Sequence, residues 1–246
     1  MRNIIIDINA DVGEGLNNES DLMPYLSSCN IACGGHAGDL QTMTKVVGLA
    51  KKHRVKVGAH PSFPDRANFG RKIMELSAAD LYATLKQQIR SLQKVLYQEH
   101  SQLHHIKPHG ALYNLAAKDV KTANVIIEVI KSIAQPIKLY APYKSVIANR
   151  AEVENIDVIY EAFADRNYND DLSLVSREND AAILNDEHVV LEHVLRMIKD
   201  QKLESINGVE VPIMASTFCV HGDTKNAYKI LHFLNEELPK NNVEIY

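Results

Sequence analysis

Short apolar runs alternate with longer segments of helical periodicity along the 246-residue chain. Most of these runs are rich in Val, Ile and Leu, which is typical of strands covered on both faces in a parallel sheet. They predict seven strands, at residues 3–8, 28–32, 55–59, 103–107, 137–141, 156–162 and 212–219.

Helices are predicted between these strands. Asp39 and Ser77 occupy N-cap positions ahead of apolar residues at helical spacing, so a helix is expected to begin after each of them. Asp223 stands in the same relation to a last helix that extends to about Leu238. Further helices are predicted at about 120–133 and at 187–202, and a short helix is predicted to end at about Arg150.

The alternation of strands and helices indicates parallel βαβ units joined by right-handed crossovers. We expect one α/β domain over residues 1–246, because a chain of this length with 46% hydrophobic residues can bury one substantial core. In barrels built from such units, the ligand site lies where the loops after the strands converge.

The charge distribution makes some partners improbable. The formal net charge is -4, with 27 Lys and Arg against 31 Asp and Glu, and the basic residues are scattered rather than clustered. We therefore expect no nucleic acid partner. The chain starts Met1-Arg2 without the apolar run of a secretion signal, and no run approaches the roughly 18 apolar residues that cross a bilayer. We expect a cytoplasmic protein with no membrane contact.

The cysteines do not form a recognisable motif. Cys29, Cys33 and Cys219 are odd in number and lack C-x-x-C spacing. We interpret them as buried thiols near strand ends, because a reactive thiolate requires nearby cations that lower its pKa.

Histidines beside small residues follow four of the predicted strands. The segment HHIKPHGALYN at 104–114 ends a strand and places Lys107 and His109 at a rigid turn. His36, His60 and His221 stand in the same relation to three other strands. A single histidine at a strand end is more often structural than catalytic, but four at equivalent positions indicate one shared pocket.

Carboxylates and other polar residues gather at the same strand ends. Asp7, Asn9, Asp11 and Glu14 are expected to line a loop over the end of the first strand, although an ordinary acidic turn has the same composition. Glu161, Asp165 and Arg166 end the sixth strand and open a polar segment over 163–180 that we interpret as a lid or a partner-facing segment. No phosphate-binding motif is visible, since GGHAG at 34–38 is not a dinucleotide fingerprint and lacks the Lys-Ser/Thr of a P-loop.

Six blocks in order resemble the LamB/YcsF family: DINADVGEG, NIACGGHAGD, VGAHPSFPDRANFGR, IKPHGALYN, EAFADRNY and CVHGD. The resemblance covers essentially the whole chain. It implies a distorted seven-stranded parallel β/α barrel, similar to the barrels of glycoside hydrolases and polysaccharide deacetylases. It also implies the role of the A subunit in an ATP-dependent 5-oxoprolinase, which opens the lactam of 5-oxoproline to glutamate. ATP would be the co-substrate, and subunits B and C of that enzyme would be the partners.

The residues allow a chemical rationale beside this resemblance. Phosphorylation of the amide oxygen would turn a resonance-stabilised lactam into a good electrophile, and it requires cations and a base. Lys107 and Arg166 could supply the cations. The base could be Asp11, His60 or His109, which with Lys107 form the predicted catalytic set. We assign substrate binding to the remaining polar residues at the strand ends: Asp7, Asn9, His36, Glu161, Asp165, Arg166, His221 and Asp223.

Two other functions remain open at this stage. Asp7 or Asp11, together with His60 and His109, could hold a divalent metal that activates water, as in a metal-dependent amide hydrolase or deacetylase. The helical H-E-x-x-H signature is absent, so such ligands would come from separate strands. Alternatively, the chain is a non-catalytic lactam-binding subunit whose partners carry out the chemistry.

Overall fold

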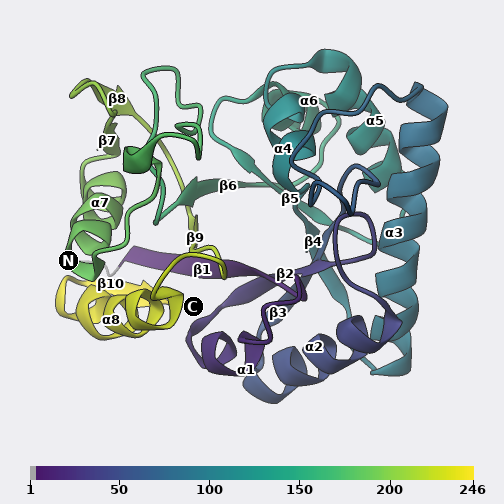
Figure 1. Ribbon diagram of the computed structural model, residues 1–246, viewed down its shortest axis with the longest axis horizontal. Helices are drawn as coiled ribbons and strands as arrows, with labels where there is room; N and C mark the ends of the chain where they lie inside the picture. Colours follow the sequence, from purple (N-terminus) through teal and green to yellow (C-terminus); the bar gives the residue numbers. More distant parts are fainter. Residues whose placement is uncertain (1–3) are drawn as a thin grey trace.

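Seven parallel strands close into a barrel in the computed structural model, which describes residues 4–246 (Figure 1). The start of the first predicted strand, Asn3, lies outside the described residues. The strand order is β1-β2-β3-β4-β5-β6-β9, and β9 pairs with β1 to complete the circle. These strands are β1 (Ile4–Val12), β2 (Ser28–Ala32), β3 (Lys56–His60), β4 (Leu103–Ile106), β5 (Lys138–Pro142), β6 (Val158–Phe163) and β9 (Thr217–Cys219).

The barrel is irregular, as the resemblance implied. The register between β3 and β4 shifts at Val57 and Gly58, and β4 pairs with β5 through only two residue pairs. An additional strand, β10 (Val243–Ile245), pairs in parallel with the start of β1 outside the circle. The predicted seven-stranded parallel β/α barrel is confirmed.

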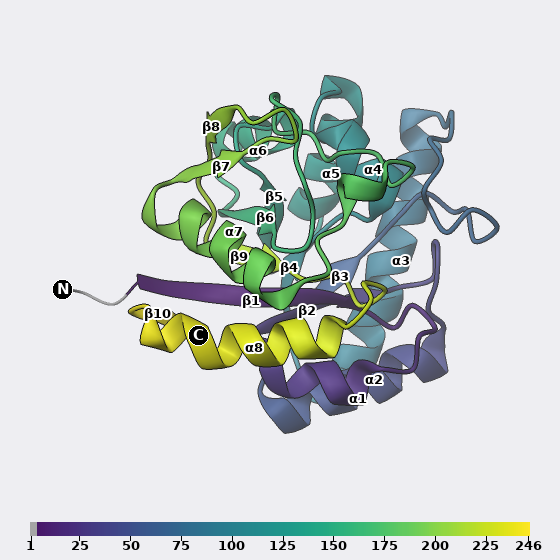
Figure 2. The same cartoon turned by 60° about the vertical axis from the view of Figure 1, so that its left-hand side comes forward.

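Helices cover the outside of the barrel (Figures 1 and 2). Figure 2 shows α8 running alongside β1, with α7 next to it. Across residues 4–246, no helix is both long enough and apolar enough to cross a lipid bilayer. The helical elements are α1 (Glu19–Leu22), η1 (Met23–Tyr25), α2 (Leu40–His53), α3 (Ala78–Gln98), α4 (Gly110–Ala116), α5 (Val120–Lys131), α6 (Val146–Val153), η2 (Asp180–Ala182), α7 (Glu187–Lys199) and α8 (Ala227–Lys240).

Two of the predicted helix caps are confirmed and one is wrong. The side chains of Asp39 and Ser77 accept hydrogen bonds from backbone N–H groups in the first turns of α2 and α3. Asp223 does not cap α8, which begins after Asn226. Its carboxylate instead forms ion pairs with two arginines, Arg71 and Arg177, and does not cap the helix.

The predicted strand at 212–219 is divided in the structure. Its first residue belongs to an antiparallel hairpin of β7 (Lys202–Glu204) and β8 (Glu210–Pro212), and only Thr217–Cys219 joins the barrel. Asn207 and Gly208 lie in the turn that connects the two strands of the hairpin, and Gly208 has a positive φ of 78°. The helix α4, directly after His109, was also not predicted.

The expectation that Asp7, Asn9 and Asp11 line a loop is wrong, because all three lie within β1. The strand continues to Val12 and is paired with β9 and β2 over these positions. Alternate side chains of a strand point to opposite faces. These three therefore point into the barrel, while the intervening apolar residues face the helices.

Polar side chains consequently fill the barrel interior, whereas the apolar core lies between the barrel and the helices. Asn9 donates to Glu161 and Thr217, at 3.0 and 2.7 Å, and accepts from Asn30 at 2.7 Å. Asn30 also accepts a hydrogen bond from His105 at 2.7 Å. Buried polar groups are stable only when they are hydrogen-bonded, so this network fixes the side chains beneath the open end of the barrel.

Candidate functional site

A cavity of about 480 Å³ opens at the C-terminal ends of the strands. Seven predicted site residues line it, together with Glu14, which was expected only in the loop after the first strand. Arg71, Tyr113 and Arg177 also line it, and the sequence did not single them out. The predicted residues in the wall are Asp11, His60, Lys107, His109, Arg166, His221 and Asp223. The other predicted residues lie behind the wall or deeper in the barrel, and these are Asp7, Asn9, His36, Glu161 and Asp165.

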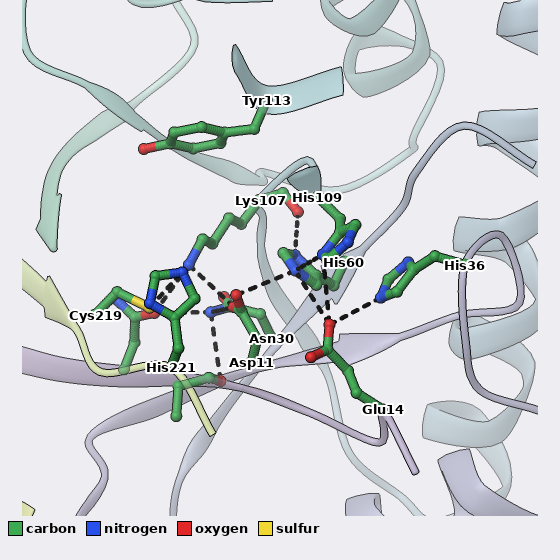
Figure 3. A network of polar contacts seen from close by, with 12 residues as sticks. Asp11, Glu14, Asn30, His36, His60, Lys107, His109, Tyr113, Cys219 and His221 are labelled. Carbon is green, nitrogen blue, oxygen red and sulfur yellow. Dashed lines mark hydrogen bonds and ion pairs between the residues drawn. The ribbon is translucent and has the colours of Figure 1, made fainter. Parts of the chain in front are cut away.

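Lys107 occupies the centre of the cavity floor (Figure 3). Its Nζ lies 3.0 Å from Asp11 Oδ1, 2.9 Å from Glu161 Oε1 and 3.1 Å from Cys219 Sγ. Burial lowers the pKa of Lys107, but the charges of Asp11 and Glu161 outweigh it and hold this pKa well above the usual value. Lys107 is therefore a fixed cation, suited to binding a negative oxygen and unsuited to acting as a base.

The carboxylates around Lys107 differ in their access to a ligand. Burial raises the pKa of Asp11, but His60 and Lys107 outweigh it, so this pKa lies well below the usual value and Asp11 is ionised. Glu161 is enclosed and accepts a hydrogen bond from the Tyr113 hydroxyl at 2.8 Å. Asp7 lies two positions deeper than Asn9 in the same strand and accepts hydrogen bonds from Ser28 and Thr217, away from the cavity.

Four side chains from the ends of four successive strands form a second cluster beside Asp11. Ligand atoms of Glu14, His36, His60 and His109 lie within 4.8 Å of one another. Figure 3 shows the three imidazoles directed toward the Glu14 carboxylate. Burial, followed by the charge of Asp11, raises the pKa of Glu14. Burial, followed by the charge of His60, lowers the pKa of both His36 and His109 to about 2, so these two imidazoles are neutral.

The protonation of two of these imidazoles is fixed by backbone carbonyls. His60 Nδ1 lies 2.7 Å from the Lys107 carbonyl, and His109 Nε2 lies 2.9 Å from the Phe69 carbonyl. A carbonyl only accepts, so each of these nitrogens carries a proton. In the neutral His109 ring, Nδ1 therefore carries a lone pair, and it lies 2.9 Å from His60 Nε2.

This arrangement fits a divalent metal. Histidine ligands typically donate their second ring nitrogen to a carbonyl or a carboxylate, as His60 and His109 do. Glu14 Oε1 lies 3.9 Å from His60 Nε2 and 3.4 Å from His109 Nδ1, so a carboxylate oxygen is available beside the facing nitrogens. Asp11 Oδ2 lies 3.3 Å from His60 Nε2 and completes a donor set of nitrogen and oxygen atoms.

His36 fits as the residue that orients Glu14. Its Nε2 lies 2.9 Å from Glu14 Oε1, and its ring is stacked on His109 at 3.6 Å with an interplanar angle of 3°. The lone pairs of two parallel, stacked rings lie in separate parallel planes, so one ion cannot lie in the planes of both rings. A proton on His36 Nε2, donated to Glu14, is consistent with the buried Nδ1, which has no hydrogen-bond partner in the described part of the chain.

His221 and Asp165 form a separate pair on the opposite wall. His221 Nδ1 lies 2.9 Å from Asp165 Oδ1, and the same carboxylate accepts from the His221 backbone and the Thr224 hydroxyl. Burial raises the pKa of Asp165, but His221 and Thr224 outweigh it and lower this pKa. The ionised carboxylate accepts a hydrogen bond from His221 Nδ1, so Nε2 is the ring nitrogen left to contact a ligand.

The lid segment is held in place by Arg166. Its guanidinium donates hydrogen bonds to the carbonyls of Ala182 and Val175, at 3.1 and 2.6 Å. Val175 and Arg177 from this segment line the cavity. Arg166 therefore lies in the predicted site, but most of its described contacts stabilise the lid.

Known proteins resemble this chain in both sequence and structure. A sequence profile of the LamB/YcsF family matches residues 6–246. The chain belongs to the LamB/YcsF family. It is 41% identical over 240 residues to the A subunit of 5-oxoprolinase from Haemophilus influenzae strain PittEE, covering 98% of each chain. It is 40% identical over 245 residues to the protein of the same name from Clostridium beijerinckii, covering 98% of this chain and 96% of that relative.

Solved structures agree with the LamB/YcsF assignment. The crystal structure of a lactam utilization protein from Thermus thermophilus aligns with a TM-score of 0.91 and 36% identity, covering 100% of this chain and 99% of that one. A structure described as T48 deacetylase with substrate aligns with a TM-score of 0.50 and 12% identity, covering 100% and 88% of the two chains. At this identity, the second likeness concerns the fold alone.

Several residues of this LamB/YcsF chain reach the site without having been predicted. Glu14 lies between Gly13 and Gly15, whose positive φ angles of 74° and 88° are readily adopted by glycine. The sequence predicts Glu14 in the loop over the end of the first strand, and only the closed barrel brings it to the histidines. Arg71 and Arg177 lie in long polar loops, where no local pattern distinguishes them from solvated arginines.

The buried thiols agree with their interpretation from sequence. All three cysteines are buried, and no disulfide joins them in residues 4–246. Burial raises the pKa of Cys33 to about 12. Burial also holds the pKa of Cys219 well above its usual value, although the charge of Lys107 opposes it. These thiols are therefore protonated at neutral pH.

Proposed function

We propose that this chain is the A subunit of an ATP-dependent 5-oxoprolinase, which opens the lactam ring of 5-oxoproline to give L-glutamate. In the proposed enzyme, ATP is the co-substrate and companion subunits B and C complete the assembly. A single-domain organisation and a cytoplasmic location stay predictions. The family relationship supports the reaction class, and the names of the relatives support the substrate.

One observation carries the catalytic role: a buried, permanently charged Lys107 faces the same cavity as the oriented imidazole of His221. A pure scaffold does not require an ammonium ion held between two buried carboxylates, which costs desolvation energy. Lactam opening requires both a group that stabilises negative oxygen and a group that removes a proton from water. The cavity offers one of each.

The proposed reaction begins with transfer of the γ-phosphoryl group of ATP to the lactam oxygen, which releases ADP. Water then adds to the activated carbon, and cleavage of the ring C–N bond releases the amine and leaves an acyl phosphate. A second water converts this acyl phosphate to a carboxylate and phosphate. In this scheme Lys107 stabilises the negative oxygens, and His221 Nε2 accepts the proton from the attacking water while Asp165 holds the ring.

A metal-assisted route is the second candidate, because His60 Nε2 and His109 Nδ1 face each other beside the Glu14 carboxylate. Glu14, His60, His109 and Asp11 would hold the ion. A divalent ion there would polarise a carbonyl oxygen or lower the pKa of a bound water. In that case the role of His36 is to orient Glu14, and Lys107 keeps Asp11 ionised.

Reconstitution tests the proposal. The purified chain is assayed for release of phosphate and glutamate from 5-oxoproline and ATP, first alone and then with the products of candidate genes for subunits B and C. Activity is expected only in the assembled enzyme, and Lys107→Ala or His109→Ala is expected to abolish it. Unchanged activity in both variants would show that this cavity does not take part in the reaction. Ring opening without ATP, abolished by a chelator, would favour the metal-dependent hydrolase.

A further inference from the structure

Two arginines from separate loops meet at one carboxylate on the wall of the cavity. Arg71 Nη2 lies 2.8 Å from Asp223 Oδ2. Arg177 Nη1 lies 3.0 Å from the same oxygen, and its Nη2 lies 3.4 Å from Asp223 Oδ1. Arg71 follows β3, Arg177 belongs to the lid and Asp223 follows β9, so the barrel closure brings them together.

The charges of this group do not cancel. Two guanidinium groups share one carboxylate, which leaves one net positive charge. Arg166 adds positive charge nearby: burial and then the charge of Arg177 lower the pKa of Arg166. Within residues 4–246, the Arg71 guanidinium has no hydrogen-bond acceptor other than Asp223, so most of its five N–H donors are free for a ligand.

The floor of the cavity has the reverse charge. Asp11 and Glu161 pair with a single ammonium, that of Lys107, and Glu14 lies beside the His109 imidazole. A ligand carboxylate would be repelled there, whereas a neutral amide could accept hydrogen bonds from Lys107 and donate to a carboxylate. The cavity therefore has one wall suited to an anionic group and a floor suited to a neutral amide.

The geometry points to Arg71 and Arg177 as the binding site for the free carboxylate of the substrate, with Asp223 positioning both arginines. The inference rests on the proposed function and deepens it, because it assigns the chain to lactams that carry a carboxylate beside the ring. Arg–carboxylate pairs are short, directional and frequently bidentate, so they also fix the orientation of the ring above Lys107. The terminal phosphate of ATP is the other oxyanion that could occupy such a pair.

Ligands that differ in the carboxylate test the inference. The purified chain is titrated with 5-oxoproline, with 2-pyrrolidinone, which is the same ring without the carboxylate, and with ATP, and binding is followed by NMR. The wild-type chain is expected to bind 5-oxoproline about 10–100-fold more tightly than 2-pyrrolidinone, the range for a hydrogen bond to a charged group. Arg71→Gln/Arg177→Gln is expected to remove this preference and to leave the affinity for 2-pyrrolidinone within about threefold of the wild-type value.

Arg90→Gln is the matched control, because Arg90 lies on α3 away from this cavity. This substitution removes one positive charge, as does each of the two substitutions in the double variant. The control is expected to keep the preference for 5-oxoproline. The inference is overturned if the wild-type chain does not prefer 5-oxoproline, or if the double variant weakens both lactams alike. It is also overturned if the variant weakens only ATP, which would assign the arginines to phosphate.

The proposed function is judged by a separate measurement, the ATP-dependent ring opening by the wild-type chain assembled with its companion subunits. Absence of that activity would count against the proposed function while leaving the binding comparison intact. If the assembled enzyme were active but accepted both lactams equally, before and after substitution of the two arginines, the proposed function would stand. The carboxylate-binding role of Arg71 and Arg177 would then be refuted.

Discussion

His60 Nε2 and His109 Nδ1 face each other at 2.9 Å, and the other nitrogen of each ring donates to a backbone carbonyl. Burial and then the charge of His60 lower the pKa of His109 to about 2, so His109 Nδ1 carries a lone pair. The Glu14 carboxylate lies 3.4 Å from this nitrogen, so the two ring nitrogens and the carboxylate form a donor set that a divalent metal can occupy.

The first prediction concerns metal binding. The purified, chelator-treated chain is expected to bind one equivalent of Zn²⁺ or Co²⁺, measured by isothermal titration and elemental analysis. His60→Ala and His109→Ala are expected to abolish this binding, because each removes a nitrogen ligand. His36→Ala is expected to weaken it by about 10–100-fold, the usual effect of losing a residue that orients a ligand.

His188→Ala is the control for the metal experiment, because His188 is exposed on α7. It is expected to bind the metal like the wild-type chain. Stoichiometric binding that survives both His60→Ala and His109→Ala would place the ion elsewhere. Failure of the wild-type chain to bind either ion would show that another interaction stabilises the two nitrogens.

The second prediction concerns the charge at the centre of the floor. Lys107→Met leaves Asp11 and Glu161 buried without their cation, and loss of one partner of a buried ion pair typically costs about 3–5 kcal/mol. The free energy of unfolding in urea is expected to fall by that amount. Lys94→Met, on the exposed surface of α3, is expected to change it by less than about 0.5 kcal/mol. Equal stability of the two variants would mean that the carboxylates near Lys107 are not ionised together.

The third prediction concerns pH. The pKa of Asp165 in the folded protein lies below the reference value of 3.8, because the interactions with His221 and Thr224 outweigh the effect of burial. Its contribution to stability is therefore fully present above about pH 4 and is lost as the pH falls through the lowered pKa. Asp165→Asn resembles the protonated carboxyl group, so the difference in unfolding free energy between wild type and variant is expected to shrink as the pH falls below about 4.

The same substitution separates orientation from binding. In the assembled enzyme, Asp165→Asn is expected to reduce kcat by about 10²–10⁴-fold with little change in KM, because His221 would lose its fixed tautomer. Asp171→Asn, on the exposed part of the lid, is the matched control.

The pH prediction has its own contradicting outcome. If the difference in unfolding free energy between Asp165→Asn and wild type stayed constant from about pH 6 to about pH 2, the pKa of Asp165 would not be lowered in the folded protein.

The fold and the common position of the strand-end histidines could be predicted because both depend on patterns along the chain. Apolar runs between helical segments indicate parallel strands, and the ends of parallel strands meet at one face. His60, His109 and His221 therefore line one cavity, with His36 directly behind His109. The apolar pattern could not reveal that the barrel interior is polar, because Asn9 has its partners on distant strands.

The charged residues at the mouth could not be predicted for a different reason. Arg71 and Arg177 are separated by more than a hundred positions and meet only through Asp223. Each stands in a polar loop, where a solvated side chain is the usual outcome. Asp223 was read as a helix cap because the local pattern satisfied that rule, and only the closed barrel supplies the competing arginines.

The last prediction connects the polar interior to the cavity through Gly58. A Cβ atom at this position would lie 2.1 Å from His105 Nε2. The His105 ring cannot move freely, since it donates to Asn30 at 2.7 Å and is stacked on Tyr140 at 3.8 Å. Gly58→Ala is therefore expected to lower the free energy of unfolding by about 1–3 kcal/mol, the range for overpacking a buried site. It is also expected to reduce activity, because Asn30 donates to Asp11 Oδ1 at 2.8 Å.

Gly48 provides the matched control for the same chemical change. It lies within α2, and an added Cβ would meet no atom within 4 Å. Gly48→Ala is expected to stabilise the protein by about 0.5–1 kcal/mol, because alanine loses less backbone entropy in a helix. Urea unfolding of both variants measures the contrast. If Gly58→Ala were as stable and as active as Gly48→Ala, the His105 ring would be free to move, and the polar interior would not be what holds Asp11 in place.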